Sequence, residues 1–371
     1  MILDCLRYWV IEYRVDGFRF DLASILGRNE DGVPMNQPPL LRNLAFDSIL
    51  GNIKLIAEAW DAGGLYQVGS FPSWKRWAEW NGRYRDDMRC FLKGDTGMAR
   101  TAAQRMTGSP DLYDPVYRGG NASVNFITCH DGFTLCDLYS YNQKHNEANG
   151  WGNTDGYDDN NSWNCGAEGN TDDPGILALR LKKMKNACAV LMCSRGSPMF
   201  LSGDEFGDTR YGNNNPYCQD NEISWLDWTL LAKEPNRELF DFFRYMIAFR
   251  KKHPAIRRDL EPSYIGFPSM SLHGLTPWEP EAPESAYAAC VLFSGYDEDS
   301  GKEDLVYIAV NAHWHPAQMT LPDLPEGYVW KIAVNTGDPL RQIFVEEEMP
   351  TAEKQLLLGE RSVIVFVGEP V

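Results

Sequence analysis

Residues 15–21 read Val-Asp-Gly-Phe-Arg-Phe-Asp, and the fold can be worked out from this stretch. Its apolar and functional side chains alternate with the period of a β-strand, so Arg19 and Asp21 share one face. The preceding residues 2–13 carry apolar side chains at helical spacing. The segment therefore predicts a helix that leads into a strand ending in a carboxylate.

Similar short apolar runs recur along the chain and end in polar residues. They are residues 53–58, which end in Glu58, residues 123–129, which precede His130 and Asp131, and residues 198–202, which precede Gly203-Asp204-Glu205. A further run at 88–92 predicts either a strand or the start of a helix. Because parallel strands present their carboxyl ends at one edge, we expect these polar residues to gather there.

Helical patterns lie between these runs. One follows Asp173, a good N-cap, with Pro174 in the first turn, and ends before Gly196 and Pro198. Another opens at Pro235 and extends to residue 252. Strands that alternate with helices predict an α/β domain with a parallel sheet.

The pattern changes after Pro254. Four segments read as strands separated by turn-like stretches, at 285–292, 304–310, 327–334 and 361–367, and no helical pattern intervenes. We therefore predict two domains, a catalytic α/β domain at 1–254 and an antiparallel β-sandwich at 255–371. Residues 149–174, rich in Asn, Asp and Gly, predict a long loop; the alternative, a calcium site, is less favoured because EF-hand spacing is absent.

Composition excludes several classes of function. The formal net charge is −17 and 43% of the residues are hydrophobic, which favours a folded protein that binds neither nucleic acid nor an anionic membrane. No apolar stretch is long enough to span a bilayer, and no secretory signal pattern opens the chain. The nine cysteines lack ligand spacing, so we expect no metal site, reduced thiols and a cytoplasmic protein.

Three strand-end carboxylates form the candidate catalytic set: Asp21, Glu58 and Asp131. Glycoside hydrolysis uses one carboxylate as nucleophile and a second as acid/base. Arg19 is expected to keep Asp21 ionised and aligned, and partial burial is expected to favour a protonated Glu58. From spacing alone, a structural role for such residues remains open.

Several strings strengthen the catalytic interpretation. Residues 15–21, Ile-Ala-Glu-Ala-Trp-Asp at 56–61 and Phe-Ile-Thr-Cys-His-Asp at 126–131 resemble three signature regions of the alpha-amylase superfamily. Three further strings resemble its isoamylase and glycogen-debranching branch: Trp-Ala-Glu-Trp-Asn-Gly at 77–82, Ser-Trp-Asn-Cys-Gly at 162–166, and Thr-Arg-Tyr-Gly-Asn-Asn-Asn at 209–215. The resemblance covers residues 1–250 and, more loosely, the β-domain.

The resemblance implies a role for each matched residue. Asp21 takes the place of the nucleophile, Glu58 that of the acid/base and Asp131 that of the transition-state stabiliser. The matched substrate-binding positions are Arg19, His130, Trp60 and Tyr211. The family mechanism is retaining and needs no cofactor, and the branch hydrolyses alpha-1,6 linkages of glycogen, amylopectin or limit dextrin.

The resemblance also implies a partial TIM (β/α)8 barrel, about strands 4–8, followed by the all-β sandwich. The family's first signature region, an Asn-His pair, is absent from the sequence, so we expect part of the sugar-binding wall to be lacking and the isolated chain to be impaired. Two alternatives stay open: a non-catalytic glucan-binding or regulatory fragment, and an alpha-1,4 amylase or transglycosylase.

Overall fold

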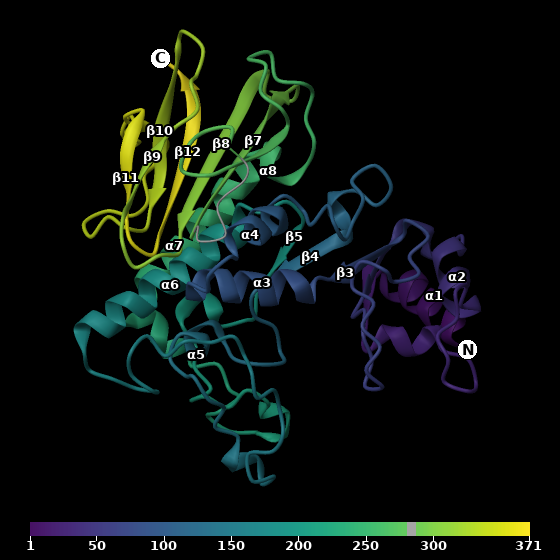
Figure 1. Cartoon of the computed structure of the whole chain (residues 1–371). Helices are drawn as coiled ribbons and strands as arrows, with labels where there is room; N and C mark the ends of the chain where they lie inside the picture. Colours follow the sequence, from purple (N-terminus) through teal and green to yellow (C-terminus); the bar gives the residue numbers. More distant parts are fainter. Residues whose placement is uncertain (280–286) are drawn as a thin grey trace. The chain divides into compact units, whose positions relative to one another are not determined.

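The structure is a computed structural model that describes residues 1–279 and 287–371 (Figure 1). The chain divides into two compact units. The first comprises residues 1–83 and 108–125, and the second residues 84–107 and 126–371.

The first unit is built on parallel strands. Its elements are α1 (Ile2–Tyr13), β1 (Gly17–Phe20), α2 (Pro39–Phe46), β2 (Lys54–Ala57), β3 (Trp77–Trp80) and the start of β4 (Ser123–Phe126). The strands pair in chain order, with Phe20 opposite Ala57 and Ala57 opposite Glu79. The residues that follow β1 and β2 therefore emerge side by side at one edge of the sheet.

A small apolar core holds the first unit together. Leu41, Leu44, Leu55 and Trp77 are fully or almost fully buried in it. The helix α1 contributes only partly buried residues, Leu3, Leu6 and Val10 among them. The helix predicted at 2–13 and the strands predicted within 15–21 and 53–58 are confirmed.

The second unit contains most of the helices. They are α3 (Gly82–Lys93, whose first two residues belong to the first unit), α4 (Ala99–Met106), α5 (Leu135–Leu138), α6 (Pro174–Met192), α7 (Asn236–Lys252) and α8 (Pro254–Arg257). The short strand β5 (Ser197–Met199) follows β4 in the strand order of the parallel sheet. Asp173 caps α6 as predicted, since its Oδ1 accepts hydrogen bonds from the backbone N–H groups of Gly175 and Ile176.

The structure settles one open prediction and adds a strand. Residues 88–92 lie inside α3, where Tyr84, Met88 and Phe91 are buried at helical spacing. The strand of this region is β3 instead, formed by the Trp-Ala-Glu-Trp string that the sequence marked only as a motif.

Residues beyond α8 form antiparallel sheets, shown in green to yellow in Figure 1. Their strands are β6 (Met270–His273), β7 (Ala288–Asp297), β8 (Lys302–Asn311), β9 (Ala317–Thr320), β10 (Tyr328–Asn335), β11 (Gln355–Leu358) and β12 (Ser362–Pro370). Five of them pair in the order β10-β12-β8-β7-β6, and β11 pairs with β9. The all-β part is thus confirmed, the domain boundary at 254/255 stays a prediction, and residues 285–286 of the first predicted strand lie outside the described residues.

The five-stranded antiparallel sheet is buried on both faces. Alternate residues of β7 divide between two cores: Val291 and Phe293 join the helices, and Cys290 and Leu292 join a core that includes Met319 of β9 and Leu358 of β11. This explains why its strands read as continuous apolar runs.

Short 3-10 helices complete the described elements: η1 (Ala23–Gly27), η2 (Leu50–Asn52), η3 (Gly120–Ala122), η4 (Glu147–Asn149), η5 (Asp204–Phe206), η6 (Pro216–Cys218), η7 (Trp228–Ala232) and η8 (Glu346–Glu348). Across the described ranges, no helix has both the length and the apolar character needed to cross a membrane. The nine cysteines are free thiols.

Candidate active site

The glycine that begins β1 is required for a steric reason. A Cβ atom on Gly17 would lie 2.7 Å from both the Cβ and the carbonyl oxygen of Lys54 on β2. A larger residue would push the two strands apart, because backbone cannot yield at that distance. Gly17 therefore permits the close pairing that sets β1 and β2 in register.

That register brings three of the predicted residues together. Arg19 lies on β1, Asp21 directly follows β1, and Glu58 directly follows β2. The Arg19 Nη1 atom is 3.0 Å from Asp21 Oδ1, and its Nη2 atom is 2.7 Å from Glu58 Oε1. One guanidinium thus bridges both carboxylates, and it also lies 4.1 Å from the ring centre of Trp80.

The two carboxylates differ in exposure. The side chain of Asp21 is 71% exposed, whereas that of Glu58 is 2% exposed. Glu58 Oε2 accepts a hydrogen bond of 2.8 Å from the backbone N–H of Leu22, a residue with a left-handed φ of 42°. The burial predicted for Glu58 is present, but the arginine and this N–H both favour its carboxylate form and oppose the desolvation that favours its acid form.

Trp60 is held beside this cluster by a stacked partner. Its ring lies 6.0 Å from that of Tyr66, with 12° between the planes. A Cβ atom on Gly82 would lie 2.6 Å from the Tyr66 hydroxyl oxygen and 3.6 Å from the Trp60 ring. The glycine that ends the Trp-Ala-Glu-Trp-Asn-Gly string thus leaves space for this aromatic pair.

A second buried glutamate, which the sequence alone did not single out, lies on β3. Glu79 is fully buried and pairs with Arg118 at 2.9 Å. It also accepts hydrogen bonds from the Gly69 backbone N–H and the Tyr113 hydroxyl. Burial raises the pKa of Glu79 above its ordinary value. Its partners lie 10 to 39 residues away in sequence, so no local pattern indicates them.

Three predicted site residues belong to the second unit. His130 and Asp131 follow β4 and are half-exposed, with 3.6 Å between His130 Nε2 and Asp131 Oδ1. The backbone N–H of Gly132 donates to the carbonyl of Asn214, which ties this segment to the 209–215 string.

Tyr211 lies in that string and is held by a buried carboxylate. Asp137 accepts hydrogen bonds from the Thr209 hydroxyl and the backbone N–H groups of Arg210 and Gly212. Tyr211 has a left-handed φ of 56° and is 48% exposed. Burial raises the pKa of Asp137 to about 6. The string is therefore an anchored turn that presents an exposed ring.

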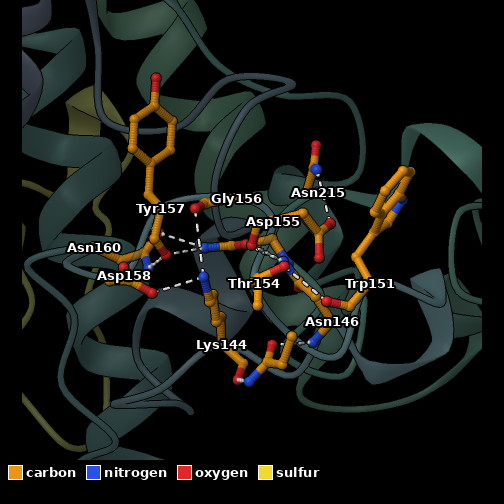
Figure 2. Close-up of polar contacts among 12 residues, drawn as sticks. Lys144, Asn146, Trp151, Thr154, Asp155, Gly156, Tyr157, Asp158, Asn160 and Asn215 are labelled. Atoms are coloured by element: carbon orange, nitrogen blue, oxygen red, sulfur yellow. Dashed lines mark hydrogen bonds and ion pairs between the residues drawn. The ribbon is translucent and has the colours of Figure 1, made fainter.

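The predicted loop at 149–174, together with residues 144–148 before it, contacts the same string (Figure 2). The Asn146 side chain exchanges hydrogen bonds with Asn214, and Asp155 Oδ2 accepts from the side chains of Asn149 and Asn215. Lys144, almost fully buried, forms an ion pair of 2.6 Å with Asp158. Side-chain amides therefore fix the loop, and the calcium alternative stays untested.

The sequence of the chain is similar to those of known proteins. The chain is 45% identical over 370 residues to isoamylase 3 of rice, and this match covers 100% of the chain and 46% of the relative. It is 45% identical over 386 residues to the GlgX homologue of Mycobacterium bovis, covering 99% of the chain and 52% of the relative. No family model matches the chain.

Solved structures show the same fold. A pullulanase from Bacillus acidopullulyticus aligns with a TM-score of 0.69 at 21% identity, over 99% of this chain and 39% of the pullulanase. A type I pullulanase from Bacillus subtilis aligns with a TM-score of 0.68 at 21% identity, over 99% of this chain and 45% of that one.

These likenesses confirm the fold class, a partial (β/α)8 barrel followed by an all-β domain. The chain is similar to isoamylases and to glycogen operon proteins of the GlgX type, as its signature strings indicated. It spans about half the length of the curated relatives it matches.

Proposed function

We propose that this chain carries the catalytic carboxylates of a retaining glycoside hydrolase that cleaves alpha-1,6 branch linkages of glycogen-type and amylopectin-type glucans. The observation that carries the proposal is the bridge from Arg19 to both Asp21 and Glu58 at one sheet edge. The isoamylase and GlgX homologues support the linkage and substrate class.

The exposures of the two carboxylates match different roles. Asp21 is open to solvent, so its carboxylate oxygen can reach an anomeric carbon. Glu58 is buried, and its desolvation favours the protonated form that a general acid needs, against the opposing effect of Arg19 and the Leu22 N–H. A single guanidinium between the two carboxylates is compatible with the separation of about 5 Å that retaining enzymes use.

The reaction then follows two steps. Asp21 attacks the anomeric carbon of the branch while Glu58 gives its proton to the glycosidic oxygen, so the main chain leaves with its O6 as an alcohol and the branch becomes a glycosyl ester on Asp21. Water, deprotonated by Glu58, next attacks the anomeric carbon of this ester and restores both carboxyl groups. Arg19 holds both groups in place throughout.

The remaining assignments follow the matched strings. Asp131 is proposed as transition-state stabiliser, with His130, Trp60 and Tyr211 as substrate-binding residues. Both His130 and Tyr211 are about half exposed and therefore accessible to a glucan. We propose a cytoplasmic location, which the nine free thiols support; the rice relative is a chloroplastic protein by name.

The test compares Asp21→Ala with Asp16→Ala, an exposed aspartate on the same segment. Reducing ends released from limit dextrin are measured for the 371-residue chain and for both variants. We expect Asp21→Ala to lower turnover by roughly four orders of magnitude and Asp16→Ala to leave it unchanged. If the parent chain shows measurable turnover, an equal rate for Asp21→Ala would refute the assignment.

A glucan-binding fragment is the second candidate function, favoured by exposed rings such as Trp151 and Tyr157 on the hydrogen-bonded loop (Figure 2). Retention on glycogen without any release of reducing ends would support it, and measurable turnover would exclude it. Linkage analysis of the products from a defined branched oligosaccharide separates debranching from alpha-1,4 hydrolysis or transglycosylation.

A further inference from the structure

A cavity of about 690 Å³ lies in the second unit, and none of the candidate active-site residues lines it. The end of α7, the turn between β7 and β8, and the strands β10 and β12 enclose it. Its volume lies within the range of cavities that bind small ligands, about 300–1,000 Å³. No motif of the sequence indicates it.

Tyrosine rings form its rim. Tyr264, Tyr296 and Tyr328 all line the cavity. Tyr264 and Tyr296 meet edge to face, with centroids 4.8 Å apart and planes at 66°. Tyr264 is 81% exposed, and its backbone N–H donates to Glu303 Oε1 at 2.7 Å. An exposed ring on an anchored backbone, in contact with Tyr296 along one side, offers a stacking surface.

The acidic groups of the cavity are already paired. Glu346 pairs with Lys252 at 2.5 Å, and Glu369 with Lys331 at 2.8 Å. Asp304 pairs with the His253 ring at 2.7 Å and accepts from a backbone N–H.

The other two lining carboxylates also have partners. Asp297 lies 3.4 Å from Arg258, and Glu303 accepts from the Ser263 hydroxyl as well as from the Tyr264 backbone. Lys252, Lys331 and Arg258 offset the charges of three of these carboxylates, and Asp304 and Glu303 accept hydrogen bonds, so most of the acidic charge is balanced within the protein. The paired groups still have hydrogen-bonding capacity, which matches an uncharged ligand rich in hydroxyl groups.

We propose that this cavity binds a short linear segment of alpha-1,4-glucan, with one glucose ring stacked on Tyr264. The choice of a glucan among neutral polyhydroxylated ligands rests on the proposed function. The site holds an unbranched part of the polymer, and it takes no part in bond cleavage.

The test measures maltoheptaose binding by titration calorimetry in an Asp21→Asn background, so that no turnover disturbs the titration. Tyr264→Ala removes the stacking ring, and Tyr264→Phe retains it. Trp314→Ala is the matched control, because Trp314 is an exposed ring of the same unit that does not line the cavity. Since Tyr264 is so exposed, its replacement is not expected to disturb folding.

We expect Tyr264→Ala to raise the Kd of one site about tenfold, and Tyr264→Phe and Trp314→Ala to change it less than twofold. An unchanged Kd in Tyr264→Ala would overturn the proposal, as would an equal loss in Trp314→Ala. Binding of inorganic phosphate in competition with maltoheptaose would also overturn it, because it would show a site for anions.

The outcome is separable from that of the proposed function. Branch cleavage is assayed on a small branched oligosaccharide, where Tyr264→Ala is expected to keep the parent kcat. If the chain binds maltoheptaose through Tyr264 but cleaves no branch, the cavity proposal stands and the proposed activity fails.

Discussion

Glu58, which directly follows β2, and Glu79, which lies on the neighbouring β3, are two buried glutamates of the first unit. Each is paired with an arginine, and they differ in what surrounds the pair. Arg118 is 8% exposed, and Glu79 receives further hydrogen bonds from Gly69 and Tyr113. Arg19 is 27% exposed and also contacts the open carboxylate of Asp21. The Glu79–Arg118 pair is therefore closed, meaning that it is enclosed by protein. The Glu58–Arg19 pair is open, because Arg19 also contacts the solvent-exposed Asp21.

It follows that a buried carboxylate–arginine pair does not by itself indicate catalysis. Asp137 in the second unit supports this conclusion. Its buried carboxyl also accepts hydrogen bonds, from the Thr209 hydroxyl and the Arg210 backbone N–H. A carboxylate that is enclosed by its hydrogen-bond donors holds backbone segments in place. In the Arg19 pair, by contrast, the carboxylate of Asp21 remains accessible to a substrate. Paired substitutions can test this distinction between closed and open carboxylate–arginine pairs.

The largest expected effect is a difference in kcat between the variants Glu58→Gln and Glu79→Gln. Glu58→Gln removes the proposed general acid and should lower kcat on a branched glucan by roughly a thousandfold, with little change in Tm. Glu79→Gln should keep the kcat per folded molecule but cost about 2 kcal/mol of stability, since Arg118 loses its carboxylate. Urea unfolding and steady-state kinetics measure both. A catalytic loss of equal size in the two variants would remove the distinction.

The closed carboxylate of Asp137 is expected to make the stability of the fold depend on pH. Its pKa of about 6 in the folded chain exceeds the ordinary value of 3.8, so the folded state holds a proton that the unfolded state releases. Between these pH values the parent should therefore lose stability as pH rises, by up to about 3 kcal/mol relative to Asp137→Asn. Unfolding free energies at pH 4, 5, 6 and 7 test this. Parallel pH profiles for parent and variant would contradict it.

The smallest effect distinguishes the two arginines. Arg19→Lys keeps the charge but cannot bridge two carboxylates in one plane, so kcat should fall about 10- to 100-fold. Arg118→Lys should leave kcat unchanged and lower stability by about 1 kcal/mol. The ratio of kcat to KM effects is informative here, since a binding role alone would raise KM at constant kcat.

Much of the fold was predictable because its signals are local. The strand at Gly17–Phe20, the cap at Asp173 and the apolar runs after Pro254 each depend on neighbouring residues. Residues 88–92 were ambiguous because a short apolar run fits either period, and burial of Tyr84 four residues before Met88 decides for a helix. The strand at Trp77–Trp80 was hidden because its alternation is obscured by two large aromatic residues.

The candidate site was predictable where its residues end strands. Asp21 and Glu58 were found because each directly follows an apolar run, and Arg19 because it shares a strand face with Asp21. Glu79 and Asp137 were missed because only distant contacts give them meaning. The cavity around Tyr264 could not be predicted for the same reason, because its walls come from segments that only the tertiary fold brings together.

The pairing of Phe20 with Ala57 has a consequence for how this sequence can change over evolution. Side chains alternate along a strand, so deleting one residue within Lys54–Ala57 would turn Glu58 to the opposite face and separate it from Arg19. Insertions and deletions should therefore be tolerated in the exposed connection around residues 29–36 and excluded from the strands. Length variation among homologues of this segment is expected to stop abruptly at Gly17 and at Lys54.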